Sequence, residues 1–259
     1  MNLGLCTIAL QEESIEDALA TAADAGYDGV ELWGKDHVGA PERCHEIRET
    51  AAELGLEIPV YGSYLRPGTP EYDEEVETEL ERAETLGASL IRVWAGQEEY
   101  QDATDDHWAD VVRDTTDLAD RAADRGFGVT VEKHEGTVTN TEAGARELIE
   151  GVDRENCGLN WQPLFEFDAE TILEEARSLA PLSNNVHLQA VAEHGDSWHD
   201  RSLLEDAYFD VPAILEAFAE TGFDGYVEVE FVTDDLEVEA AIERDREFLA
   251  SVVGVDGER

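Results

Sequence analysis

The sequence predicts a single (β/α)8 barrel over residues 1–259, and three observations carry this prediction. A phrase recurs in which an acidic, alanine-rich stretch is followed by a glycine and then by a short β-branched or aromatic run. Eight candidate strands in this length correspond to about one βα unit per 32 residues, which suits a barrel. The chain also has no GxGxxG after its first predicted strand and no Gly/Pro/Ser-rich linker that would mark a second domain.

The expected strands and helices follow from local signals taken in chain order. The recurring phrase is clear at five places, where the strands end at Trp33, Tyr61, Trp94, Glu132 and Glu230. Three further runs complete the set: LGLCT near the N-terminus, CGLNWQ around Asn160 and NNVHLQ around His187. Each clear phrase has a glycine at the helix-to-strand corner, where only glycine takes left-handed backbone without penalty: Gly26, Gly55, Gly87, Gly126 and Gly222. Two helix starts have cap residues: Ser14, with Asp17 three residues on, and Thr141, after Asn140.

The alternation of strands and helices leaves two architectures open. Strands joined through helices run parallel with right-handed crossovers, in an open doubly wound sheet as in a closed barrel. Eight units without a dinucleotide-binding glycine motif favour the closed barrel. Active sites of such barrels lie at the C-terminal ends of the strands, so functional residues are expected there.

The composition is strongly acidic, with 63 Asp and Glu against 17 Lys and Arg and a net charge of −46. Only Lys35 and Lys133 are lysines, and the acids are spread along the whole chain. Molar salt shortens the screening length to about 3 Å, from about 8 Å at physiological ionic strength, which makes such self-repulsion tolerable. We therefore hypothesise a halophilic protein from a salt-rich cytoplasm.

The same composition narrows the classes of partner. Nucleic acid is disfavoured, because binding a phosphate backbone requires Lys and Arg. Cys6, Cys44 and Cys157 are far apart and odd in number, so neither a disulfide framework nor a structural zinc site is expected. No apolar run approaches the roughly 18 residues of a membrane span, and no leader pattern is present. We expect a cytoplasmic protein without a membrane partner, and a homo-oligomer stays open.

Polar side chains gather at the predicted strand ends. Residues two apart on a strand share a face, so each strand end offers a pair. The pairs are Glu31 and Trp33, Arg92 and Trp94, Glu132 and His134, Asn160 and Gln162, His187 and Gln189, and Glu228 and Glu230. Burying such groups without partners is costly, so they indicate a hydrated, functional mouth. Two carboxylates, an imidazole and an amide oxygen suit a divalent cation such as Mg²⁺, Mn²⁺, Co²⁺ or Zn²⁺.

At these residues the chain resembles the xylose-isomerase-like barrels, particularly the sugar-phosphate isomerase/epimerase group, over essentially its whole length. The motifs that carry the resemblance are GYDGVELWG at 26–34, VEKHEG at 131–136, GLNWQP at 158–163, VHLQ at 186–189 and GFDGYVEVE at 222–230. The resemblance implies one metal ion held by Glu132, Gln162, His187 and Glu230. Gln162 stands where the family usually has an aspartate, and its amide oxygen can ligate a cation but brings no charge.

The resemblance also implies proton transfer beside a carbonyl through an enediolate, with Glu132 and Glu230 as catalytic acid and base. We therefore expect a metal-dependent isomerase or epimerase of a sugar, a sugar phosphate or a keto-polyol. The alternatives are a keto-polyol dehydratase that uses the same enolate and a metal-free binding barrel without turnover. An apurinic-site endonuclease is disfavoured, because those relatives hold further zinc ions with His and Asp ligands that GLNWQP lacks.

Substrate contacts are expected around the ligands, from His134, Glu31, Arg92, Trp94, Lys35 and Gln189. Arg92 either neutralises a phosphate or pairs with an acidic neighbour. Trp33 and Trp94 either stack on a sugar or belong to the core. Lys133 alternates away from the barrel interior, so we expect a buried salt bridge towards the helices. The segment EHGDSWHD at 193–200 is expected to be a polar loop over the mouth, with a second metal site as the alternative: His194, Asp196 and His199.

Overall fold

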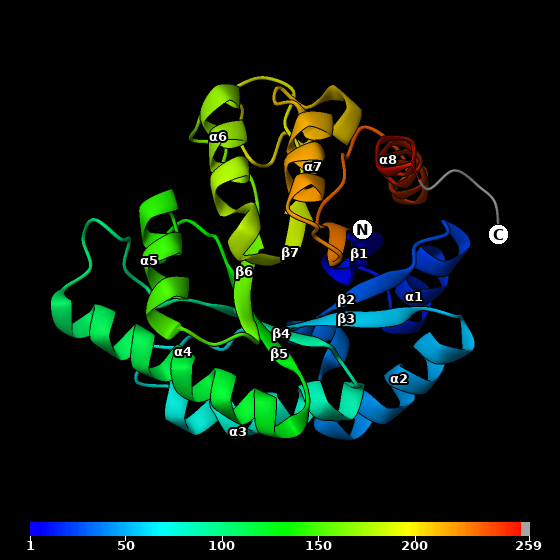
Figure 1. The fold of residues 1–259 in the computed structure, drawn as a ribbon. Helices are drawn as coiled ribbons and strands as arrows, with labels where there is room; N and C mark the ends of the chain where they lie inside the picture. The colour runs from blue at the N-terminus through cyan, green and yellow to red at the C-terminus, as the bar shows by residue number, and fades with distance from the viewer. Residues whose placement is uncertain (255–259) are drawn as a thin grey trace.

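The computed structural model describes residues 1–254 and shows a closed barrel of parallel strands surrounded by helices (Figure 1). The strands follow chain order around the barrel, and β1 closes it by pairing with β8. The strands are β1 Asn2–Cys6, β2 Gly29–Trp33, β3 Glu57–Gly62, β4 Leu90–Trp94, β5 Gly128–Glu132, β6 Cys157–Trp161, β7 Ser183–Leu188 and β8 Tyr226–Val229. The main helices are α1 Ile15–Asp24, α2 Cys44–Glu53, α3 Tyr72–Leu86, α4 Asp105–Arg125, α5 Glu142–Val152, α6 Ala169–Leu179, α7 Val211–Glu220 and α8 Val238–Val253. The predicted (β/α)8 barrel is confirmed.

The local signals of the sequence are found in their expected places. All five corner glycines have positive φ, with values of 80° at Gly26 and 89° at Gly126 for example. The side chain of Ser14 accepts a hydrogen bond from the backbone N–H of Asp17 at 3.1 Å, and α1 begins at the next residue. Thr141 caps α5 in the same way. Chain-local chemistry therefore sets the helix boundaries.

The strands divide their side chains between two environments. Apolar residues such as Leu3, Leu5, Val129 and Val131 are fully buried and belong to the hydrophobic core between the strands and the helices. The alternate positions point into the barrel and are mostly glycine or hydrogen-bonding residues. Barrels of this class usually fill their interior with branched apolar side chains. Here the apolar packing is concentrated outside the strands, and the interior is polar.

Gly62 at the end of β3 shows how crowded this interior is. A Cβ atom at this position would lie 2.4 Å from Oε1 of Glu31 and 2.9 Å from Nη2 of Arg92. Both contacts are closer than Cβ atoms tolerate, so the glycine provides the space in which a buried ion pair forms. The backbone of β3 is thus shaped around the charges of its neighbours β2 and β4.

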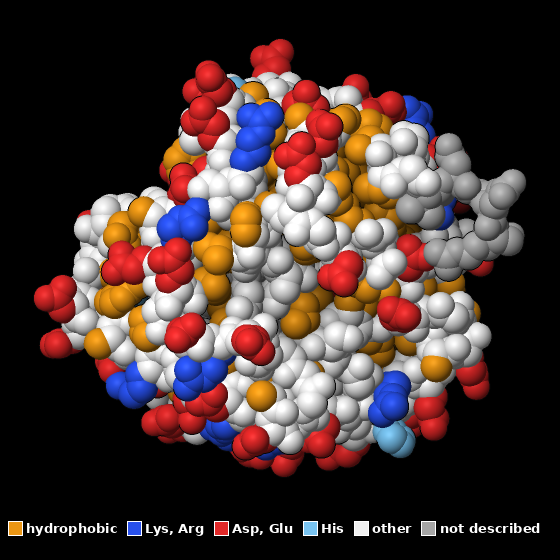
Figure 2. Space-filling model, in the orientation of Figure 1, with side chains coloured by type: hydrophobic (Ala, Val, Ile, Leu, Met, Phe, Trp, Pro, Cys, Tyr) orange, Lys and Arg blue, Asp and Glu red, His pale blue; other side chains and the backbone are white. Residues whose placement is uncertain are grey.

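The surface agrees with the strongly acidic composition. Figure 2 shows carboxylate side chains scattered over the visible face, with a smaller number of basic ones among them. The acidic groups thus form no single patch on this face.

Within residues 1–254, no helix combines the length and the apolar character needed to cross a membrane.

Candidate active site

Arg92 on β4 stands between two glutamates inside the barrel. Its Nε donates to Oε1 of Glu31 at 2.8 Å, and its Nη1 donates to Oε2 of Glu132. The indole N–H of Trp94 also donates to Oε2 of Glu132. All three charged residues are buried, with Arg92 only 6% exposed. Of the two roles expected for Arg92, the structure shows pairing with acidic neighbours.

The pKa values of the carboxylates follow from this pairing. Burial raises the pKa of Glu31, but the Arg92 guanidinium and the His187 ring outweigh burial and lower it to about 2. At Glu132 burial is likewise outweighed, chiefly by Arg92, so its pKa is lowered. At Glu230 burial dominates and raises the pKa. The site therefore contains carboxylates of unequal basicity, and Glu230 holds a proton more readily than Glu132.

Two glutamine amides connect Glu132 to Glu230. Nε2 of Gln162 donates to Oε1 of Glu132 and to the carbonyl oxygen of Lys133, each at 2.9 Å. Nε2 of Gln189 donates to Oε2 of Glu230 at 2.8 Å and to Oε1 of Gln162 at 3.4 Å. Gln162 thus holds Glu132 with its amino group and directs its amide oxygen towards Gln189.

His187 on β7 lies between two sets of carboxylates. The outer set is Glu132 and Glu230, and the inner set is Glu31 and Glu228. Nδ1 of His187 is 3.7 Å from Oε1 of Glu230, and its Nε2 is 2.8 Å from Oε2 of Glu31. Burial disfavours the charged imidazole, but Cys6 and Glu31 outweigh burial and raise the pKa of His187 well above its ordinary value. The ring therefore lies between two groups of hydrogen-bond acceptors.

The donor set at the outer group fits a divalent cation. Glu132, His187 and Glu230 each offer one ligand atom, and these atoms lie within 4.8 Å of one another. Nδ1 of His187 is buried and has no hydrogen-bond partner among the described residues. Carboxylate oxygens with one imidazole nitrogen suit Mn²⁺, Co²⁺ and Zn²⁺ alike. These three residues would hold the cation, with the amide oxygen of Gln162 nearby.

A cavity of about 390 Å³ lies at this group. Its polar lining comes from Glu135 and from six predicted site residues: Arg92, Glu132, His134, Gln162, Gln189 and Glu230. Its aromatic lining comes from strand ends and loops: Tyr64, Trp94, Phe165, Trp198 and Phe231. A larger groove of about 700 Å³ lies at α7 and α8, but it shares none of these residues. The smaller cavity is therefore the candidate substrate site.

His134 and Trp94 are placed together at the cavity. Their ring centroids are 5.0 Å apart, and Trp94 also contacts Glu132 through its indole N–H. Nδ1 of His134 lies 2.6 Å from the carbonyl oxygen of Glu135, so this nitrogen carries the hydrogen in the bond. Nε2 of His134 then keeps its lone pair for other partners.

Two expected substrate contacts, Lys35 and Glu31, are not among the residues that line the cavity. Lys35 is exposed and lines a separate cavity beside Tyr61 and Glu79, because a π-helical turn over Gly34–Val38 follows β2. Trp33 is buried, and its indole N–H donates to the hydroxyl of Tyr64 at 2.7 Å. For Trp33 the core alternative therefore describes the structure. Lys35 is expected from the sequence to contact the substrate, but it lines a different cavity.

Lys133 and the loop after β7 agree with the simpler expectations. Nζ of Lys133 lies 3.0 Å from Oε2 of Glu175 on α6, and the lysine is fully buried. In the loop, Trp198 lines the cavity. Among the described residues, the clusters suited to a metal do not include His194 or His199. Through Trp198 the loop reaches the cavity, as expected for a polar loop at the mouth.

Sequence reasoning missed Cys6 as a member of the site. Its Sγ lies 3.4 Å from Nε2 of His187, and its side chain shares the barrel interior with Glu31 and Glu228. The available signal was the register of the first strand, because Cys6 is two residues after Gly4, which faces Glu228 inside the barrel. A single cysteine without a spaced partner gave no reason to use that signal.

Comparisons with known proteins agree with the fold. The family model described as xylose isomerase-like TIM barrel matches residues 19–252. A 3-dehydroshikimate dehydratase of Bacillus anthracis is 25% identical over 209 residues, which cover 74% of this chain and 72% of the relative. A 3-dehydroshikimate dehydratase of Pseudomonas aeruginosa is 27% identical over 90% of this chain, which spans only 38% of that longer relative.

Solved structures share the architecture at lower sequence identity. The IolI protein, whose structure has a bound zinc atom, is similar with a TM-score of 0.83 and 21% identity over the full length of both chains. A D-allulose 3-epimerase from Methylomonas sp. has a TM-score of 0.78 and 16% identity, covering 97% of this chain and 98% of the epimerase. These likenesses concern the fold of the whole barrel.

Proposed function

Because the chain belongs to the xylose isomerase-like TIM barrel family, we propose that it is a metal-dependent enzyme that removes a proton next to the carbonyl of a polyhydroxylated ketone. The observation that carries this proposal is the group of Glu132, His187 and Glu230, whose donor atoms lie within 4.8 Å of one another. A divalent cation bound there would polarise the carbonyl oxygen of a substrate. The adjoining cavity has the volume of a small-molecule site.

We assign the proton transfer to Glu230. Burial raises its pKa, and among the described residues only Gln189 donates a hydrogen bond to its side chain, at Oε2. Glu132 accepts from Arg92, Trp94 and Gln162, and hydrogen bonds to the charged form make a carboxylate a weaker base. Glu132 therefore keeps its negative charge and positions the groups around it, while Glu230 transfers the proton.

This inequality favours dehydration as the overall reaction. Glu230 takes the proton from the carbon beside the carbonyl, and the resulting enolate expels a hydroxyl from the next carbon. Glu230 then returns that proton to the departing hydroxyl, which leaves as water, so one C–H and one C–O bond break and one C=C bond forms. The names of the two curated dehydratase relatives support this choice.

Epimerisation or isomerisation of a sugar is the second candidate. It needs two groups that exchange protons with the substrate, and Glu132 and Glu230 both line the cavity. In that reaction the enediolate formed by one glutamate is reprotonated by the other. Both candidate reactions pass through the same enolate and differ in what happens to it next, because only dehydration loses water.

The surroundings of the cavity favour a substrate that carries a carboxylate. The guanidinium carbon of Arg66 lies 4.2 Å from the ring centroid of Trp94, and that of Arg201 lies 3.8 Å from the ring centroid of Phe231. Nε and Nη2 of Arg201 are buried without hydrogen-bond partners among the described residues. Two cations beside the aromatic wall, one with spare donors, suit a keto acid better than a neutral sugar.

The experiment follows substrate protons and product together. The enzyme with Mn²⁺ in molar KCl is incubated in deuterated water with a cyclic keto acid of the dehydroshikimate type and, separately, with ketoses. We expect deuterium exchange beside the carbonyl and loss of water from the keto acid, and we expect Glu230→Gln to abolish both.

Glu220→Gln, a substitution on the surface of α7, is the matched control and should leave turnover unchanged. If Glu230→Gln exchanged substrate protons for deuterium as fast as the unchanged protein, Glu230 would not be the base. Exchange with an epimerised ketose and no loss of water would select the second candidate.

A further inference from the structure

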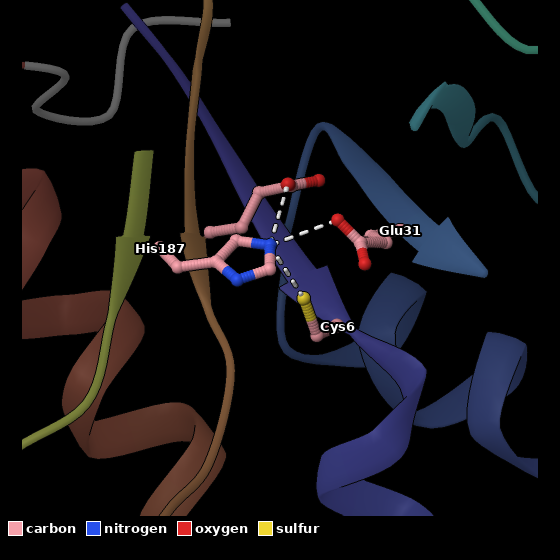
Figure 3. Close-up of side chains that lie close together, drawn as sticks. Cys6, Glu31 and His187 are labelled. Carbon is pink, nitrogen blue, oxygen red and sulfur yellow. Dashed lines mark hydrogen bonds and ion pairs between the residues drawn. The ribbon is translucent and has the colours of Figure 1, made fainter. Parts of the chain in front are cut away.

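A second group of donors lies inside the barrel on the other side of His187. Its members are Cys6 at the end of β1, Glu31 on β2, His187 on β7 and Glu228 on β8. These strands are neighbours, because the barrel closes between β8 and β1. None of the four residues is more than 2% exposed. Figure 3 shows Cys6 and Glu31 directed at the same edge of the His187 ring.

Nε2 of His187 faces more acceptors than it can satisfy. Oε2 of Glu31 lies 2.8 Å from it, Sγ of Cys6 lies 3.4 Å away and Oε2 of Glu228 lies 3.6 Å away. An imidazole nitrogen carries at most one hydrogen, which points in a single direction. Three acceptors around one N–H are therefore an arrangement that a cation among them would satisfy better than a proton.

Glu228 directs Oε2 towards His187, and its other carboxylate oxygen is left without a partner in the described part of the chain. Oε2 of Glu228 accepts from Asn185 at 2.6 Å, but Oε1 is buried and has no hydrogen-bond partner among the described residues. Oε1 faces β1, where a Cβ atom on Gly4 would lie only 3.0 Å from it. A buried carboxylate oxygen without a donor costs free energy unless a cation or donor reaches it.

The spacing of the donors suits tetrahedral zinc. With Zn–S near 2.3 Å and Zn–N near 2.0 Å, the S···N edge of a tetrahedron is about 3.5 Å and an N···O edge about 3.3 Å. The Cys6–His187 and Glu228–His187 separations of 3.4 and 3.6 Å are close to these edges. The Glu31 oxygen, at 2.8 Å, needs to withdraw by about half an ångström.

We propose that Cys6, Glu31, His187 and Glu228 form a second cation site, a thiolate-containing zinc site that competes with the outer group for His187. Thiolate ligands select Zn²⁺ over Mn²⁺ and Mg²⁺, which prefer oxygen. Binding would displace the thiol proton of Cys6 to solvent, so one S–H bond is exchanged for one Zn–S bond.

The competition follows from the single lone pair of a neutral imidazole. Ligation at the outer group uses Nδ1 and places the hydrogen on Nε2, facing Glu31. Ligation at the inner group uses Nε2 and places the hydrogen on Nδ1, facing Glu230. A zinc ion in the inner site thus withdraws His187 from the outer group, and its effect on turnover, unlike the site itself, rests on the proposed function.

The test uses Co²⁺ as a coloured substitute for Zn²⁺. A Cys44→Ala/Cys157→Ala chain leaves Cys6 as its thiol and is titrated with Co²⁺ after treatment with a chelator. We expect a thiolate-to-cobalt charge-transfer band in the near ultraviolet, displaced by Zn²⁺, and its retention in a chain that also carries Glu132→Gln. Adding Cys6→Ser should remove the band and weaken Zn²⁺ binding at least about tenfold, the loss seen even for residues that only orient ligands.

The outcomes separate this site from the outer one. Cobalt bound without a charge-transfer band, or cobalt binding lost in the Glu132→Gln chain, places the ion in the outer group and overturns the proposal. The band is measured on a chain that keeps Cys6, so the test does not depend on whether Cys6→Ser folds. In turnover assays with Mn²⁺, Zn²⁺ should inhibit the chain with Cys6 more strongly than the Cys6→Ser chain. Should the proposed reaction fail, the band remains measurable.

Discussion

Nε of Arg92 donates to Oε1 of Glu31 across 2.8 Å in the interior of the barrel, where their side chains are 7% and 3% exposed. The same guanidinium pairs with Glu132 on the opposite side. One cation therefore compensates two carboxylates, each from a different strand. A buried group of this kind is stable only while it is complete, because each remaining charge has lost its water.

Arg92→Met should destabilise the protein strongly. Methionine fills similar space but leaves Glu31 and Glu132 facing each other without a cation, and breaking a buried pair costs about 3–5 kcal/mol. We expect the free energy of unfolding, measured with urea in molar KCl, to fall by that amount. Arg43→Met is the control, because the Arg43–Glu16 pair is about half exposed and such pairs contribute about 0–1 kcal/mol. Equal losses in the two variants would contradict the interpretation.

Arg201→Gln should weaken binding of an acidic substrate. Its guanidinium lies against Phe231 and has donors without partners, so a substrate carboxylate would gain a charge-assisted hydrogen bond there. We expect KM for a keto acid to rise about tenfold, the equivalent of about 1.4 kcal/mol, with kcat little changed. Arg244→Gln removes only an exposed ion pair with Glu205 and should leave KM unchanged. An unchanged KM in Arg201→Gln would remove this residue from the substrate site.

Asp245→Asn should stabilise the protein at alkaline pH. Asp245 is 1% exposed on α8, and burial raises its pKa to about 7. A raised carboxyl pKa favours folding below the unfolded pKa of about 4, and this stabilisation is lost as the pH rises through about 7. The amide keeps the acceptor for the N–H of Leu204 and carries no charge. We expect about 2 kcal/mol more stability at pH 8, half of the full linkage value, and no change at pH 4; a difference independent of pH would refute this cause.

Salt should stabilise the folded chain. The net charge of −46 makes self-repulsion large in dilute buffer, and molar KCl screens charges beyond about 3 Å. We expect Tm to rise by about 5–10 °C between dilute buffer and molar KCl, which corresponds to about 2–3 kcal/mol for a domain of this size. NaCl at the same molarity should give a similar rise, because screening depends on ionic strength. An identical Tm in both buffers would end the hypothesis of adaptation to salt.

The barrel could be predicted because its signals are local. Gly26 and Gly126 mark corners through their own backbone freedom, and Ser14 caps a helix that begins at the next residue. Strand ends at Trp33, Trp94 and Glu132 were located to the residue, since alternation and corner glycines bracket each strand. Such features need no knowledge of distant residues.

The pairings inside the site could not be predicted in the same way. Arg92 and Glu31 are 61 residues apart, and Cys6 and His187 are 181 residues apart. Their contacts depend on how far neighbouring strands are staggered when the barrel closes, which strand periodicity does not specify. Lys35 was misplaced for a related reason, because a turn just beyond a strand carries its side chain away from the axis.

The polar interior separates the chemistry of this protein from its stability. Val129, Val131 and their counterparts pack outward against the helices, so most of the apolar surface is buried without help from the residues inside. Donors within the barrel can then be exchanged over evolutionary time without repacking the shell, provided that their charges stay balanced. Selection can thus change ligands and substrates at nearly constant architecture.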